Sequence, residues 1–162
     1  MLKICTVFFD GLYHPNTVTK LYRSLKENST VPFEFICLSD RENDFDGDAM
    51  GDVVLPYNHH SNIKKHWHKL KFFSSQFAYQ NPGDDIIIMD IDQHIVGNVD
   101  EILNYPVKEG ELLTYDSWWN VKTNKFADRV IIPINGGFYK FKSGSFNYIW
   151  DDFSLNPEYW QL

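Results

Sequence analysis

The segment 84–100 reads DDIIIMDIDQHIVGNVD, and its first half predicts the strand around which the fold is built. Ile86–Met89 is a short apolar run rich in β-branched residues, and an Asn-Pro-Gly turn at 81–83 precedes it. This combination is typical of a strand buried on both faces, as in a parallel sheet. The sequence therefore predicts a central strand that ends near Met89.

Two aspartates, Asp90 and Asp92, follow this strand directly. If the extended geometry continues, residues two apart point the same way, and both carboxylates face one side. Two like charges held that close repel each other, and a shared cation relieves the repulsion. In α/β proteins, ligands bind beyond the carboxyl ends of the strands. The pair predicts a metal site, and the alternative is two solvated turn residues.

A strand–helix–strand unit is predicted at the start of the chain. Leu2–Phe9 and Phe33–Leu38 are apolar runs suited to central strands. Between them, apolar residues recur at helical spacing from Val18 to Leu25, and Asn16 or Thr17 can cap that helix. A crossover of this kind places the two strands parallel to each other.

Further helices and strands are predicted along the rest of the chain. Residues 63–79 predict one helix with an apolar stripe, and residues 145–160 predict another that Pro157 stops. A short strand is expected at 53–56, and others at 111–115, 130–134 and 138–141, the last after Gly136-Gly137. The stripe comprises Trp67, Leu70, Phe73 and Phe77, and the basic residues beside it are Lys64, Lys65, His66, His68, Lys69 and Lys71. A solvated face is the default interpretation of those basic residues. A structural zinc site at His59, His60, His66 and His68 lacks a ligand set of known spacing.

Composition limits the class of protein. A chain of 162 residues is long enough for one domain, residues 1–162, with a proper core. The formal net charge of −7 argues against nucleic-acid binding, which depends on Lys and Arg neutralising phosphates. Cys5 and Cys37 lie in apolar runs without CxxC spacing, so two reduced core thiols are expected. No apolar run has the length of a membrane span and no signal-peptide pattern opens the chain, so a cytoplasmic location is expected.

The segment 84–100 also resembles the strand-plus-DxD signature of GT-A fold glycosyltransferases, in particular the family-8-like branch. In that family an apolar pair, a Gly-Asn turn and an acidic-apolar segment follow the DxD. Here Ile95-Val96, Gly97-Asn98 and Val99–Leu103 take those places. The resemblance extends in order from Ile4 to about Trp150, and implies a Rossmann-like α/β fold with a mixed, mainly parallel central sheet flanked by helices.

The resemblance implies a donor site in this chain. The residues expected to bind the nucleotide sugar are Phe9, Asp10, Gly11, Tyr13, Asp40, Lys69, Asp90, Ile91, Asn135, Gly136 and Gly137. Lys69 lies in the aromatic-x-basic-Leu element that approaches the donor phosphates, and the Asn-Gly-Gly run lines the sugar pocket. Asp90 and Asp92 are the expected metal ligands, and Asp92, Asp116 and Lys69 the expected catalytic residues. Without the resemblance, Asp10 and Asp40 are equally well interpreted as turn formers.

The function that the resemblance implies is transfer of a hexose from a UDP-sugar, UDP-glucose or UDP-galactose first, with Mn²⁺ or Mg²⁺ and with retention of configuration. The acceptor, whether glycan, lipid or protein, is not indicated. Longer members of the family continue beyond the point that corresponds to Leu162, so we expect an acceptor side that is reduced or supplied by a partner, and a homodimer. The alternatives are a nucleotide-sugar-binding module without transfer activity and a metal-dependent phosphohydrolase with a nucleophilic aspartate.

Overall fold

The computed structural model describes residues 1–9, 11–40, 52–56, 62–116 and 134–161. Its centre is a six-stranded sheet with the order β3-β2-β1-β4-β6-β5. The strands are β1 (Leu2–Phe8), β2 (Glu34–Ser39), β3 (Val53–Pro56), β4 (Asp85–Met89), β5 (Leu113–Asp116) and β6 (Ile134–Lys142). Strands β1 to β4 run parallel to one another, whereas β6 is antiparallel to both β4 and β5. The predicted mixed, mainly parallel α/β sheet is confirmed.

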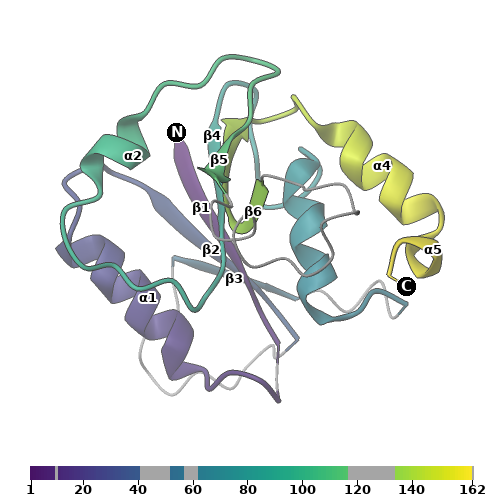
Figure 1. The fold of residues 1–162 in the computed structure, drawn as a ribbon, viewed down its shortest axis with the longest axis horizontal. Coiled ribbons are helices and arrows are strands. Elements are labelled where there is room, and N and C mark those ends of the chain that lie inside the picture. Colours follow the sequence, from purple (N-terminus) through teal and green to yellow (C-terminus); the bar gives the residue numbers. More distant parts are fainter. Residues whose placement is uncertain (10, 41–51, 57–61, 117–133, 162) are drawn as a thin grey trace, which may run out of the picture.

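Helices cover both faces of this sheet (Figure 1). The helices α1 (Asn16–Glu27) and α2 (Asp100–Asn104) lie on one side, whereas the 3₁₀-helix η1 (Lys65–Phe73), drawn in teal, and α4 (Asn147–Leu155) lie on the other. Ile4 and Phe8 of β1 pack in the core with α1, and Cys5 and Val7 pack in the core with η1. Because both faces are buried, the central strands read as continuous apolar runs.

The unit β1–α1–β2 has the predicted parallel strands, with Phe8 opposite Ser39. The predicted cap is wrong, because α1 begins at Asn16 after Pro15 and has no side-chain cap. Pro15 already has helical backbone angles, with φ −50° and ψ −35°. A proline ring fixes φ in the helical range, so the helix starts at once and Asn16 falls inside its first turn.

Residues 63–79 do not form the single α-helix that the stripe predicts. The helical part is of the 3₁₀ type and ends at Phe73, and Ala78 and Tyr79 have positive φ angles that no helix continues through. Trp67, Leu70 and Phe77 nevertheless pack together against α4. The expected solvated basic face is also wrong in part, since His68 and Lys71 are buried.

The carboxyl-terminal region does not form the single helix that the sequence predicts. Residues 147–160 form two helices, and Pro157 opens the second, α5 (Pro157–Trp160), instead of stopping one long helix. Asn156 accepts a hydrogen bond from the Tyr159 amide, as an N-cap residue does before a proline at the first helical position.

Gly136 and Gly137 lie within β6 and not before it. The predicted strand at 130–134 falls almost wholly outside the described residues.

Two expectations from composition can be compared with the structure. Cys5 and Cys37 are free and buried, which confirms the two reduced core thiols. Burial raises the pKa of the Cys37 thiol to about 12, so this side chain stays protonated. Within the described ranges, no helix combines the length and the apolar character needed to cross a bilayer.

Candidate functional site

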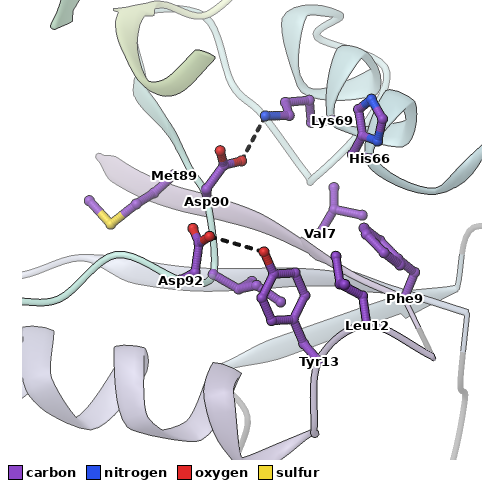
Figure 2. Close-up of a pocket in the computed structure, with 10 residues that line it drawn as sticks. Val7, Phe9, Leu12, Tyr13, His66, Lys69, Met89, Asp90 and Asp92 are labelled. Carbon is purple, nitrogen blue, oxygen red and sulfur yellow. Dashed lines mark hydrogen bonds and ion pairs between the residues drawn. The ribbon is translucent and has the colours of Figure 1, made fainter. Parts of the chain in front are cut away.

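A pocket of about 230 Å³ lies at the carboxyl ends of β1 and β4 (Figure 2). Its walls come from β1 and the loop after it, from η1, and from the end of β4 and the turn after it. The lining residues are Val7, Phe9, Leu12, Tyr13, His66, Lys69, Met89, Asp90, Ile91 and Asp92. One wall is apolar and aromatic, and the other carries the charged groups. The pocket is therefore at the place where α/β sheets bind ligands.

The two aspartates reach the pocket through a turn, not through strand alternation. The strand β4 ends at Met89, although the Asp90 amide still donates a hydrogen bond of 3.0 Å to the Gly137 carbonyl of β6. The Gln93 amide then donates to the Asp90 carbonyl at 3.3 Å, which closes the turn. The predicted reason for their proximity is thus wrong, but both Asp90 and Asp92 line the same pocket.

Lys69 forms an ion pair with the first aspartate, Asp90. Its ammonium donates to Asp90 Oδ1 at 2.6 Å and to the Gly136 carbonyl at 3.0 Å. The Lys69 side chain is only 18% exposed and that of Asp90 is 41% exposed, so this ion pair sits at the mouth of the pocket. A cation so fixed is available to an anionic ligand without any rearrangement of the helix.

Tyr13 forms a hydrogen bond with the second aspartate, Asp92. Its hydroxyl donates a hydrogen bond of 3.0 Å to Asp92 Oδ2. This bond, with burial and the charges of both aspartates, raises the pKa of Tyr13, because each disfavours a phenolate. The Tyr13 ring meets the Phe9 ring edge to face, with 6.2 Å between centroids. Each carboxylate therefore has its own partner, as Figure 2 shows.

The Asn-Gly-Gly run of β6, residues 135–137, adjoins Asp90. Asn135 Oδ1 accepts a hydrogen bond of 2.7 Å from the Gly137 amide. A Cβ on Gly137 would lie 2.9 Å from Gln93 Nε2 and 3.1 Å from Asn135 Oδ1, whereas one on Gly136 would meet nothing closer than 3.6 Å. A side chain at position 137 would thus fit only if the ends of the Gln93 and Asn135 side chains moved away.

The remaining expected site residues are more scattered. Gly11 lies in the loop after β1 with a φ of +93°, a conformation that favours glycine. Asp40 follows β2 and Asp116 ends β5; both are exposed, and neither lines the pocket. Asp10 lies outside the described residues.

Four lining residues were not predicted from the sequence: Val7, Leu12, His66 and Met89. Val7 and Met89 belong to apolar strands, where nothing in the sequence separates a pocket residue from a core residue. His66 did carry a signal, because it lies three residues before Lys69 on the same helical segment. The pairs Lys65/His68 and His68/Lys71 share that spacing, so it did not single out His66.

The donor set at the pocket fits a hard divalent cation. Asp90 and Asp92 contribute carboxylate oxygens, the ligands that Mg²⁺ and Mn²⁺ prefer. No group of three or more His, Cys, Asp or Glu that could hold a metal occurs in the described part of the chain. A carboxylate pair nevertheless matches the way such ions bind nucleotides in proteins, with one or two carboxylates and the remaining positions taken by phosphate and water.

No protein-family model matches the sequence, and no curated protein sequence matches it. Solved structures do match. The galactosyltransferase LgtC, in complex with donor and acceptor sugar analogs, superposes with a TM-score of 0.71 at 11% identity, over 94% of this chain and 63% of that chain. GlyE, a glycosyltransferase of Streptococcus pneumoniae TIGR4, gives a TM-score of 0.56 at 10% identity, over 94% of this chain and 36% of that chain.

These similarities establish the fold. The chain has the GT-A-type fold of the glycosyltransferases LgtC and GlyE, with a mixed sheet flanked by helices. It spans 63% of the length of the LgtC chain and 36% of the GlyE chain.

Proposed function

We propose that this chain is a glycosyltransferase domain that binds a UDP-hexose, UDP-glucose or UDP-galactose, with a divalent cation. The observation that carries the proposal is the composition of one pocket, in which an aromatic wall faces two carboxylates and a lysine. A nucleoside diphosphate has the matching composition, a flat base and a charged diphosphate. The fold shared with LgtC supports the same conclusion.

The apolar wall would receive the nucleoside. Phe9 and Tyr13 meet edge to face, and the exposed Leu12 extends the same wall. An aromatic side chain can bind a planar base by stacking on its face. Since these residues follow β1, the base would lie over the carboxyl end of that strand and the diphosphate would extend toward η1 and the turn after β4.

The charged wall would receive the diphosphate. Asp92 and Asp90 would hold Mn²⁺ or Mg²⁺, and the cation would supply Lewis-acid stabilisation of the charge on the leaving diphosphate. Lys69 is placed by Asp90 and by the Gly136 carbonyl so that its ammonium faces the same space. On binding, Lys69 can exchange one of these acceptors for a phosphate oxygen, which keeps its charge compensated throughout.

The donor sugar would lie toward β6. Asn135 is half-buried beside Asp90, and Asp116 pairs with Ile134 at the end of β5. We propose these two as the residues that contact sugar hydroxyls. Among the described lining residues, the only carboxylates are the two proposed cation ligands. Retention of configuration, which needs no separate carboxylate base to activate the acceptor, fits this set better than inversion.

The test is calorimetric titration of UDP, UDP-glucose and UDP-galactose, with manganese and with EDTA, followed by an assay for release of free hexose. Binding that requires manganese supports the proposal, and hexose release separates an enzyme from a binding module. A Glu109→Gln variant serves as the control for loss of one surface carboxylate, since Glu109 is exposed and lies outside the pocket. If the affinity for UDP-sugar is the same in EDTA as in manganese, no cation takes part in binding at this site. A trapped phospho-aspartate would instead favour a phosphohydrolase.

A further inference from the structure

His66 shares with Lys69 the face of η1 that borders the pocket. In a 3₁₀-helix, residues i and i+3 are eclipsed, whereas an α-helix would offset them around the axis. Both side chains line the pocket, and Figure 2 shows them on the same helical segment. The unexpected 3₁₀ geometry therefore stacks an imidazole one turn before the lysine, at the wall that faces the two carboxylates.

The surroundings of His66 leave its ring nitrogens available. The side chain is exposed, and its ring packs against that of Trp67 with 5.7 Å between centroids. Within the ranges that the structure describes, no hydrogen bond engages the His66 ring. The nearby histidine of the same segment differs, because His68 Nε2 lies 3.0 Å from the Ile63 carbonyl in the core. Of the two, only His66 is placed to meet a ligand.

Several charged groups face this imidazole. Burial and the positive charge of Lys69 lower the pKa of His66, and Asp90 acts in the opposite direction with a smaller effect. Lys65 on the same helix lies over the Phe9 ring, 5.6 Å from its centroid. Across the pocket, Asp92 is engaged by the neutral hydroxyl of Tyr13. In the empty pocket, His66 is therefore mostly neutral at pH 7, where an ordinary histidine of pKa about 6.5 is already largely deprotonated.

We propose that His66 is a second donor to the diphosphate of the nucleotide sugar, beside Lys69. The inference rests on the proposed function, since it requires a nucleotide diphosphate in this pocket. A diphosphate brings negative charge to a neutral imidazole, and negative charge favours the protonated ring. His66 would then take up a proton on binding and donate a charge-assisted hydrogen bond to a phosphate oxygen. Affinity should consequently fall as the pH rises above neutrality.

The experiment is titration of UDP-glucose and UDP-galactose at saturating manganese, at about pH 6.5 and about pH 8.5, the range over which a histidine loses its proton. These ligands are chosen because their diphosphate, esterified at both ends, does not itself titrate in this range. Calorimetry in two buffers of different ionisation enthalpy measures the protons taken up. The parent should bind more tightly at the lower pH and take up protons there.

His66→Gln should bind at least about tenfold more weakly at the lower pH, the loss expected for one hydrogen bond to a charged group, and should match the parent at the higher pH. Its proton uptake should vanish, while its affinity for uridine, which lacks phosphate, should not change. His66→Lys carries a permanent charge and should retain tight binding with a flat pH profile. His94→Gln is the control, because His94 is also exposed but does not line this pocket.

The outcomes separate this inference from the proposed function. If the parent binds UDP-sugars but His66→Gln keeps the pH dependence and the proton uptake, His66 is a surface residue and the inference is wrong. If His66→Gln weakens uridine and UDP-glucose equally, the side chain supports the base and not the diphosphate, and the inference is again wrong. A parent that binds neither UDP-sugar with manganese overturns the proposed function and this inference together.

Discussion

The Tyr13 hydroxyl donates a hydrogen bond of 3.0 Å to Asp92 across 79 residues of sequence. The bond joins the loop after β1 to the turn after β4, so it ties the aromatic wall of the pocket to its acidic wall. A carboxylate has two oxygens, and Tyr13 engages Oδ2 alone. Within the described part of the chain no hydrogen bond engages the other oxygen, and the bond to Tyr13 orients the group before any ligand arrives.

Tyr13→Phe should therefore weaken manganese-dependent UDP binding although the ring remains. The phenyl ring keeps the contact with Phe9, while Asp92 loses the donor that orients it. We expect a loss of about three- to tenfold in affinity, comparable to one hydrogen bond, and little change in melting temperature. Titration of UDP in manganese and in EDTA measures it. Tighter binding by the variant would mean that Tyr13 competes with the cation.

Asp92→Asn and Asp90→Asn should differ in their effects. Among the described residues, the partner of Asp92 is a neutral hydroxyl, so its substitution removes a full negative charge from the proposed cation site, and manganese-dependent binding should be abolished. Asp90 is already paired with Lys69, so its substitution should weaken binding less and change the preference between UDP-glucose and UDP-galactose. Neither should unfold the protein, since both side chains are well exposed and asparagine keeps an oxygen that can accept the hydrogen bond from Lys69 or Tyr13.

Titrations of both UDP-sugars into both variants, with melting curves as folding controls, measure this difference. Glu109→Gln should behave as the parent in each titration. If Asp92→Asn binds as tightly as the parent, the cation does not bind there and the proposed function loses its main support. If Asp92→Asn melts far below the parent, the aspartate is structural.

Gly137→Ala and Gly136→Ala form a matched pair in adjacent positions of β6. The first places a methyl group 2.9 Å from Gln93 Nε2 and 3.1 Å from Asn135 Oδ1, and the second finds no atom closer than 3.6 Å. Both contacts are with the ends of side chains that can shift, so we expect a cost of about 1 kcal/mol, the lower end of the range for overpacking. Because Asn135 and Asp90 adjoin that position, Gly137→Ala should also weaken UDP-sugar binding, whereas Gly136→Ala should affect neither property strongly. Urea unfolding and titration measure both, and equal stability of the two variants would contradict the close approach.

The sheet could be predicted because its central strands are buried on both faces. Leu2–Phe9 is mostly apolar and Ile86–Met89 is wholly apolar, and no helical pattern fits either run. The position of the aspartates after β4 could be predicted for the same reason. Their partners could not, because Lys69 is 21 residues from Asp90 and Tyr13 is 79 residues from Asp92. Such pairs depend on how the strand order brings loops together.

The helix type of η1 could not be predicted either. Over a segment as short as Lys65–Phe73, apolar spacings of three fit both an α-helix and a 3₁₀-helix. The choice depends on tertiary contacts, among them the buried contact of His68 with the Ile63 carbonyl. The helix type bears on the proposed role of His66, since a 3₁₀-helix aligns it with Lys69 more closely than an α-helix does.

The hydrogen bonds of Asp100 predict how the free energy of unfolding depends on pH. Its carboxylate accepts hydrogen bonds from the Ser29 hydroxyl and from the Thr30 amide and hydroxyl, which fasten the start of α2 to the loop after α1. These bonds hold the pKa of Asp100 well below its usual value of about 3.9. A carboxyl group whose pKa is lowered by folding adds to the free energy of unfolding at pH values above its usual pKa. This contribution is lost as the pH falls from the usual pKa toward the lowered one. Urea unfolding should therefore show Asp100→Ala less stable than the parent at neutral pH, with the difference narrowing under acid. Glu109→Gln should track the parent throughout, and a difference that stayed constant into acid would show that the contribution of Asp100 does not depend on its charge.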